Sequence, residues 1–341
     1  MNETEIRNYL STLTVGICYN VKKHVDTSTI DAEAEYDNIT TVEAIKHSLE
    51  LCGCAVELFE EDGAILDKLK ESHIDIVFNI AEGHGGRGRE AQVPAILNLY
   101  GISYTGSDET TLCVALDKAL TKRVLCTYHI KTPKYFYASK DKPIKATGLT
   151  FPVILKPNAE GSSKGISEVS VVNNHKQLVE VVKHLFNSYH QDVLIEEYIE
   201  GREFTVGLLG NGKDVTVFEP MEIKFNKPTQ DSYCVYSYTV KQIYEQYVQY
   251  VCPPELTEQQ SKKIKQTAKN IFNILGCNDF ARVDFRMAND GTLHFIEINP
   301  LPGLAPNYSD FPMLANFCGV DYDTLIYRIL TTALKRLGKI G

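Results

Sequence analysis

The chain has 341 residues, 43% hydrophobic and 23% charged, which predicts a folded protein of two or three compact domains. Its formal net charge of −9 argues against non-specific binding to nucleic acid or to an anionic membrane. No apolar stretch approaches the roughly 20 residues of a membrane span, and the first residues lack the basic start of a signal peptide. Nine cysteines lie mostly in apolar runs, as at Cys18, Cys113 and Cys277, which predicts buried, reduced thiols in a cytoplasmic protein.

Residues 13–107 predict an α/β unit. Apolar strands are expected at residues 13–19, 56–59, 74–80 and 102–105, and helices at 41–52 and 91–99. Strands that alternate with helices form a parallel sheet, whose ligand sites lie at the carboxyl ends of the strands.

A glycine-rich loop, residues 82–90, follows the third of these strands. It holds two arginines, Arg87 and Arg89, and two glutamates, Glu82 and Glu90. Backbone N–H groups and guanidinium groups at a strand end bind anions, and the glutamates can pair with these arginines or with a substrate ammonium. We favour a binding role over a mobile surface loop.

The next part of the chain, residues 117–199, predicts an α+β module. Helices are expected at 118–128 and 175–189, and strands at 151–157, 166–172 and 193–199. The loop at residues 158–165 is rich in glycine and serine and can cradle phosphate, and Lys156 precedes it. Taken alone, the loop is more typical of an ordinary hairpin loop than of a phosphate site, and Lys156 is more typical of a solvated lysine than of a phosphate ligand.

The remainder mixes strands with helices at residues 258–275 and 322–337, each followed by a glycine. The polar, tyrosine-rich residues 225–250 predict a long loop, and long loops in compact domains are often lids.

A hairpin near the C-terminus carries a pair of acids. Its strands are residues 281–285 and 295–300, and the turn at residues 289–291 reads Asn-Asp-Gly. Alternate side chains share a face of a strand, so Asp284 lies with Arg282, and Glu297 with Asn299. Such oxygen donors suit Mg²⁺ bound to substrate phosphates. The hairpin therefore predicts chemistry on a nucleoside triphosphate.

Taken together, these motifs resemble the ATP-grasp ligases of the D-alanine–D-alanine ligase family from about residue 74 to the C-terminus. Eight ordered motifs carry the resemblance: residues 82–86, 104–107, 117–122, 155–157, 161–165, 196–203, 281–285 and 297–303. It implies an α/β and α+β protein, in which an N-terminal parallel-sheet (pre-ATP-grasp) domain, residues 1–110, precedes a two-part ATP-grasp fold, residues 111–200 and 201–341. It also implies a homodimer.

The resemblance further implies a role for each site residue. The residues that would bind ATP are Lys118, Lys156 and Ser163 at the phosphates, Glu196, Glu197, Tyr198 and Ile199 at adenine, and Glu203 at ribose. Two Mg²⁺ ions, for which Mn²⁺ is a substitute, would be held by Asp284, Glu297 and Asn299. The catalytic residues would be Ser162 in the loop over the γ-phosphate, Lys241 in the lid, and Arg282 with the Gly303 N–H at the oxyanion.

The implied reaction is ATP-dependent formation of a peptide bond between amino acids or small peptides. Transfer of the γ-phosphoryl group to a carboxylate makes an acyl phosphate, which an amine attacks, so that ADP and phosphate are released. Two alternatives of other classes are an inactive ATP-binding regulatory protein and a kinase for a small carboxylate or hydroxyl. The intact lysines and acids argue against the regulatory protein.

Departures from the family pattern lie at the substrate contacts. The family's N-terminal glutamate motif is missing, and Glu33, Glu35 and Glu43 are its candidate replacements. Gln242 stands where a lid tyrosine is expected, with Tyr244 nearby. Arginines replace acidic residues in the glycine-rich loop, and Tyr308 with Ser309 follows Gly303 where a serine is expected. We therefore assign Glu82, Arg87, Arg89, Tyr308 and Ser309 to the substrates, and hypothesise that the substrate is not, or not only, D-alanine.

Overall fold

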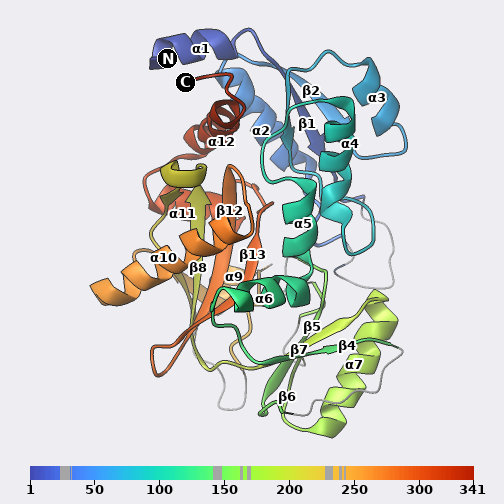
Figure 1. Cartoon of the computed structure of the whole chain (residues 1–341), viewed down its shortest axis with the longest axis vertical. Coiled ribbons are helices and arrows are strands. Elements are labelled where there is room, and N and C mark those ends of the chain that lie inside the picture. Colours follow the sequence, from blue (N-terminus) through green and yellow to red (C-terminus); the bar gives the residue numbers. More distant parts are fainter. Residues whose placement is uncertain are drawn as a thin grey trace.

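The computed structural model describes residues 1–23, 31, 33–140, 148–161, 164–166, 170–226, 233–237, 240–241 and 243–341. Three sheets follow one another along this part of the chain: one parallel sheet of three strands and two antiparallel sheets of four and six strands (Figure 1). Their strands fall within residues 1–110, 111–200 and 201–341, respectively. Among the described residues, no helix has the length and apolar character needed to cross a membrane.

The N-terminal sheet is parallel, as predicted, with the order β2-β1-β3. Its strands are β1 (Thr14–Tyr19), β2 (Ala55–Glu60) and β3 (Ile76–Asn79), and its helices are α1 (Glu3–Leu10), α2 (Ile39–Leu51), α3 (Ile65–Glu71) and α4 (Gln92–Tyr100). The strand expected at residues 102–105 is reduced to a single bridge between Val77 and Tyr104. The chain turns away there, because Gly106 adopts a φ of 90° before the next helix.

The second sheet is antiparallel, with the order β4-β7-β5-β6. This part comprises α5 (Glu109–Leu116), α6 (Lys118–Thr127), β4 (Tyr135–Ala138), β5 (Val153–Pro157), β6 (Val171–Val172), α7 (His175–Tyr189) and β7 (Val193–Glu197). Helix α7 covers one face, where Leu178 and Val182 join the core of the sheet. The strand expected at residues 166–172 is described only as the short β6, since residues 167–169 lie outside the described residues.

The third sheet has the order β11-β10-β8-β12-β13, and β9 pairs with β8. Its elements are β8 (Gly201–Leu209), β9 (Thr216–Val217), β10 (Met221–Phe225), α9 (Tyr244–Tyr247), β11 (Val248–Val251), α10 (Glu258–Ile274), β12 (Phe280–Ala288), β13 (Leu293–Asn299), α11 (Asp310–Phe317) and α12 (Tyr322–Arg336). Helix α10 packs on one face through Ile264 and Ile271.

The expectation of a loop throughout residues 225–250 is wrong at its C-terminal end. Residues there form α9 and the start of β11, and Val248 pairs with Phe225 at the edge of the third sheet. Val240 and Val248 pack on Ile223 in a small apolar cluster. This contact between distant residues gives no periodic signal in the sequence, so the pattern alone did not reveal the strand.

The C-terminal helix returns to the N-terminal sheet. Helix α12 packs against α2 in a core that also contains strand β1. Figure 1 shows both chain ends at the same end of the molecule, and the Met1 ammonium donates to the Gly341 carbonyl at 3.2 Å. The expectation of a buried Cys113 is wrong, because this residue lies exposed on α5; all nine cysteines are free thiols.

Candidate active site

Two neighbouring strands carry the acids of the predicted metal site. In the β12–β13 pair, Asp284 lies opposite Glu297, and Arg282 lies opposite Asn299. Arg282 donates from Nε and Nη2 to the two Asp284 oxygens at 3.1 and 3.0 Å, and Asn299 Nδ2 donates to Asp284 at 3.4 Å. The predicted hairpin therefore gathers these side chains on one face.

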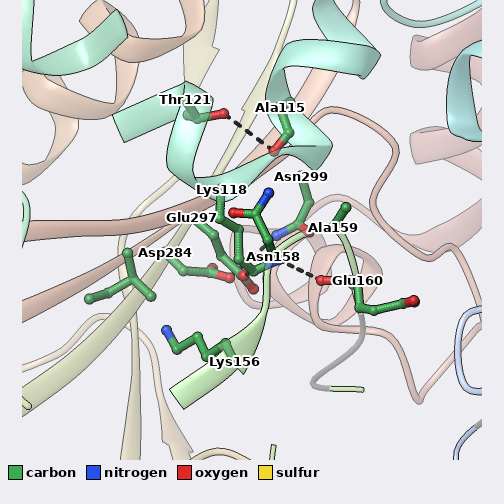
Figure 2. A network of polar contacts seen from close by, with 12 residues as sticks. Ala115, Lys118, Thr121, Lys156, Asn158, Ala159, Glu160, Asp284, Glu297 and Asn299 are labelled. Carbon is green, nitrogen blue, oxygen red and sulfur yellow. Dashed lines mark hydrogen bonds and ion pairs between the residues drawn. The ribbon is translucent and has the colours of Figure 1, made fainter. Parts of the chain in front are cut away.

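The start of helix α6 brings Lys118 to these acids. Lys118 Nζ lies 3.3 Å from Glu297 Oε2 and also donates to the carbonyl oxygen of Glu160 (Figure 2). Asp117 caps the helix by accepting from Leu120 N–H, and Asn158 donates to Asp117 at 2.8 Å. The cap and the Asn158 contact together fix the position of the lysine.

Lys156 forms a second ion pair in the site. Its Nζ lies 3.1 Å from Glu196 Oε2, and Lys122 Nζ lies 2.8 Å from Glu196 Oε1. Burial would raise the pKa of Glu196, but these two lysines hold it below its ordinary value. Lys122 is completely buried, so its charge stabilises Glu196 inside the protein. Lys156 also lines a pocket, where it can contact a ligand.

That pocket lies between the two antiparallel sheets and collects most of the residues assigned to ATP. Its lining includes Lys156, Glu196, Glu197, Tyr198, Ile199, Glu203, Lys241, Asp284 and Glu297. Ile154, Ile223 and Ile296 provide apolar walls. Apolar walls with a few convergent polar groups are typical of a cofactor site.

Arg286 supports the far end of this pocket. Its Nη1 donates to the Ile199 carbonyl at 2.7 Å, and its Nη2 lies 3.0 Å from Glu203 Oε2. The guanidinium also lies over the Tyr198 ring, 4.8 Å from the ring centroid. Arg286 therefore fixes the segment assigned to adenine and the acid assigned to ribose.

The donor set of the hairpin fits magnesium. Burial would raise the pKa of Glu297, but Lys118, Lys156, Lys241 and Arg282 hold it at about 2, so the carboxylate is ionised. No cluster of three His, Cys, Asp or Glu side chains placed to hold a metal occurs in the part of the chain that the structure describes. Asp284 and Glu297, with the Asn299 amide, match instead the demand of Mg²⁺ for one or two carboxylates plus substrate phosphates.

The glycine–serine loop contacts the N-terminal segment. The Glu35 carboxylate accepts from Gly161 N–H, and Asp31 accepts from Gly165 N–H at 2.7 Å. Ser162, which we assigned to the loop over the γ-phosphate, and Ser163, which we assigned to the ATP phosphates, lie outside the described residues. Of the three glutamates considered as replacements for the missing motif, Glu35 is therefore the one observed at this loop.

The two arginines of the glycine-rich loop are both paired within the chain. Arg89 is buried, forms an ion pair with Glu35 and donates to the Ala159 carbonyl at 2.7 Å. Arg87 is exposed and lies 2.6 Å from Asp117 Oδ2. Burial, together with the neighbouring Glu90, raises the pKa of Glu82 well above its ordinary value. The reversed charge that we noted in the sequence is therefore compensated by acids from other parts of the chain.

A smaller pocket adjoins the pocket that contains Lys156 and Glu297. It is lined by Ala34, Tyr236, Lys241, Arg282, Gly303, Tyr308, Ser309 and Asp310. The Ser309 hydroxyl accepts from Ala305 N–H at 3.1 Å, while Tyr308 is 42% exposed. Arg282 and Gly303, the groups assigned to the oxyanion, thus share a pocket with both residues assigned to the second substrate.

Comparisons with known proteins identify relatives across most of the chain. The family model described as D-ala D-ala ligase C-terminus matches residues 129–331. A D-alanine–D-alanine ligase from Pseudothermotoga lettingae is 34% identical over 271 residues, which cover 80% of this chain and 84% of that protein. A D-alanine–D-alanine ligase from Syntrophotalea carbinolica is 32% identical over 309 residues, which cover 90% of this chain and 94% of that protein.

Solved structures share the fold. The D-alanine–D-alanine ligase from Bacillus anthracis complexed with ATP superposes with a TM-score of 0.75 at 21% identity, covering 96% of this chain and all of that one. The VanG D-Ala:D-Ser ligase from Enterococcus faecalis gives a TM-score of 0.72 at 19% identity, with 94% of this chain and 99% of that one covered.

The order of one parallel sheet followed by two antiparallel sheets, with a pocket between the latter two, is the ATP-grasp fold of the solved relatives. The family model and the sequence relatives define the class as ATP-dependent ligases that form a carbon–nitrogen bond. The chain belongs to the D-alanine–D-alanine ligase family. It is an ATP-dependent ligase that forms a peptide bond between amino acids. The family resemblance, fold class and enzyme class predicted from the sequence are thus confirmed.

Three residues of the site were not singled out from the sequence. Arg286 follows Asp284 by two positions on β12, so the alternation that joined Arg282 with Asp284 also pointed to it. Lys122 lies within the motif at residues 117–122, but only burial reveals its structural role. Asp310 gave no signal beyond its position after Ser309.

Proposed function

We propose that this enzyme joins two molecules of D-alanine, or of a closely similar small amino acid, through an acyl phosphate. The observation that carries the proposal is the single pocket that contains Lys156, Asp284 and Glu297 together with residues 196–199. The relatives that cover most of the chain are D-alanine–D-alanine ligases by name, which supports D-alanine as the first substrate to test.

The first step activates a carboxylate. A carboxylate is a poor acyl donor because oxide is a very poor leaving group, and phosphorylation replaces oxide with phosphate. We assign Lys118 and Lys156 to the ATP phosphates, residues 196–199 to adenine and Glu203 to ribose. Phosphoryl transfer needs positioning and neutralisation of charge. Lys156 lines the pocket, and Lys118 lies 3.3 Å from Glu297, which lines it too, so both ammonium groups are placed to serve these needs.

We further propose that Asp284, Glu297 and Asn299 hold Mg²⁺, two ions in the complete site, with Mn²⁺ as a substitute. Bound there, the metal would neutralise charge that develops on the phosphate oxygens. Arg282 keeps the Asp284 carboxylate oriented, as their two hydrogen bonds indicate.

The second step forms the peptide bond. Arg282 and the Gly303 N–H are assigned to the oxyanion of the tetrahedral intermediate, where fixed donors lower the barrier. Lys241 is assigned to the lid, which would exclude water from the acyl phosphate. Its position in both pockets, with Nζ 4.0 Å from Asp310, supports this role.

For the ammonium of the first substrate we propose Glu35. It contacts the backbone of Gly161, next to Ser162, and belongs to a segment whose Ala34 lines the smaller pocket. Its ion pair with Arg89 orients the carboxylate.

The arginines of the glycine-rich loop do not select a particular substrate. Because Arg87 and Arg89 are both paired with acids, they no longer give a reason to expect a substrate other than D-alanine. We still propose that Glu82, Arg87, Tyr308 and Ser309 contact the substrates, which mutation of each residue would test.

The test is ADP release by the purified enzyme with ATP, Mg²⁺ and pairs of amino acids, including D-alanine, D-serine and L-alanine. We expect release that requires both an acid and an amine, with D-alanyl-D-alanine detected by mass spectrometry. Release with one acceptor and no amine would indicate a kinase instead. ATP binding without release under any pair would indicate a regulatory protein.

We also propose that the enzyme works in the cytoplasm, and that it forms the homodimer that the family resemblance implies. The nine free thiols support a reducing compartment. Light scattering coupled to size-exclusion chromatography tests the dimer, and a mass of one chain at micromolar concentration would contradict it.

A further inference from the structure

One buried carboxylate of the site has no role among those assigned above. Asp310 is the first residue of α11 and is 6% exposed. It lines the pocket that we assign to ATP, which contains Lys156 and Glu297, and also the smaller pocket that contains Arg282 and Gly303. Asp310 therefore lies at the junction where an activated acyl group and an incoming amine would meet.

Among the described residues, the contacts of Asp310 occupy only part of its hydrogen-bonding capacity. Arg282 Nη1 lies 3.3 Å from Oδ2, and the Tyr236 hydroxyl donates to Oδ1 at 3.0 Å. Lys241 Nζ is more distant, at 4.0 Å from Oδ2. A carboxylate has roughly four acceptor positions, so Asp310 can accept further hydrogen bonds from a group in the pocket.

The need to neutralise the charge of Arg282 does not by itself explain why a buried carboxylate stands at position 310. Asp284 already accepts two hydrogen bonds from the Arg282 guanidinium. Burying a carboxylate is costly, and the Tyr236 hydroxyl and the Lys241 ammonium join Arg282 in offsetting that cost. Lys241 lies 4.0 Å away, so an ammonium group that enters the pocket can form a closer ion pair with Asp310 than Lys241 does.

We propose that Asp310 binds the ammonium group of the amine-bearing amino acid and holds its nitrogen beside the acyl carbon. The ammonium loses one proton before its nitrogen attacks, and the Asp310 carboxylate that accepts its hydrogen bond can take that proton. The C–N bond forms, the bond to phosphate then breaks, and the second proton leaves with the phosphate. Hydrogen bonds from Arg282 to an acyl oxygen and from an ammonium to Asp310 are each about 2.8–2.9 Å long. Because Nη1 and Oδ2 are 3.3 Å apart, an acyl group held by Arg282 and an amino group held by Asp310 would be neighbours in the pocket, as a near-attack arrangement requires.

This inference rests on the proposed ligase reaction and assigns the charge that the second substrate must carry. An amino acid arrives mostly as an ammonium ion near neutral pH. An uncharged nucleophile, by contrast, needs no carboxylate for binding. Asp310 therefore matters for amino-acid acceptors and not for formation of the acyl phosphate.

The experiment compares Asp310→Asn with the wild-type enzyme in two assays on the same preparation. With D-alanine as both substrates, kcat/KM for the second D-alanine should fall at least 100-fold in the variant. With hydroxylamine, which is uncharged near neutral pH and traps acyl phosphates as hydroxamates, the rate should change less than threefold. Retained hydroxamate formation also shows that Arg282 and the fold are intact.

Asp67→Asn, an exposed aspartate on α3, is the matched control and should leave both rates unchanged. Equal loss in both assays would overturn the inference, since Asp310 would then act only as a support for Arg282. Unchanged dipeptide formation in Asp310→Asn would overturn it as well. If the wild-type enzyme forms neither dipeptide nor hydroxamate, the proposed ligase function itself fails, which is a separate outcome.

Discussion

The ammonium nitrogen of Lys118 lies 3.3 Å from a carboxylate oxygen of Glu297. Lys118 begins α6 and Glu297 lies on β13, so the contact joins the two halves of the proposed ATP-grasp fold. It brings a proposed phosphate-binding group directly to a proposed metal ligand. Phosphates and metal would therefore meet at this pair.

Replacing Glu297 tests the metal assignment. Glu297→Ala should abolish amine-dependent ADP release while the protein stays folded, because one of two carboxylates in the donor set is lost. Activity within about tenfold of wild type, roughly 1.4 kcal/mol of barrier, would exclude Glu297 as a metal ligand. Glu57→Ala, at an exposed position on β2, is the control and should retain full activity.

The two lysines on Glu196 should behave differently when each is replaced by methionine. Lys156→Met should raise the KM for ATP at least about tenfold, since a charge-assisted contact to phosphate contributes about 1.5–3 kcal/mol. Lys122→Met should instead lower the free energy of unfolding by about 3 kcal/mol, because a buried ion pair loses one partner. Steady-state kinetics and urea denaturation of both variants check this, and a larger ATP effect for Lys122→Met would reverse the assignment.

The Glu35–Arg89 ion pair can be isolated with a double-mutant cycle. Arg89→Met leaves the buried Glu35 carboxylate without its guanidinium and should destabilise the fold by about 3–5 kcal/mol. Adding Glu35→Gln should recover part of that loss, because the unpaired charge is then removed. Thermal or urea unfolding of the four proteins gives the coupling energy, and simple additivity would show that the pair contributes little.

The stability of the protein should depend on the ionisation of Glu90. Burial raises the pKa of Glu90 to about 7, with Glu35 and Glu160 adding to the effect and Arg89 opposing it. Unfolded glutamate titrates at about 4.3. The folded state thus binds the proton more tightly, so this contribution to stability is complete below about pH 4 and is lost as the pH rises to about 7.

Glu90→Gln removes that pH dependence. Relative to wild type, the variant should gain about 2.5 kcal/mol more stability at pH 8 than at pH 5. Urea denaturation at the two pH values measures the difference. An equal change in the free energy of unfolding at both pH values would mean that the pKa of Glu90 is not raised in the folded protein.

Much of the fold could be predicted from local pattern. Helices α7, α10 and α12 lie within about two residues of their expected bounds, because amphipathic spacing and caps are properties of short segments. The β12–β13 hairpin was also predictable, because its turn and alternation set both register and face. Strand β11 was not, since it exists through pairing with β10 and through a cluster of distant apolar residues.

Ordered motifs and strand alternation can be read directly from the order of residues, so they were enough to predict the family, the reaction class and the group of acids on one hairpin. Which charges meet was set by the folding of the chain in three dimensions. It paired Arg89 with Glu35, Arg87 with Asp117 and Lys156 with Glu196, all residues far apart in the chain. The physical reason is that charge compensation depends on distance and burial in space, and the same reason brought Asp310, a residue without any motif, to the acyl end of the site.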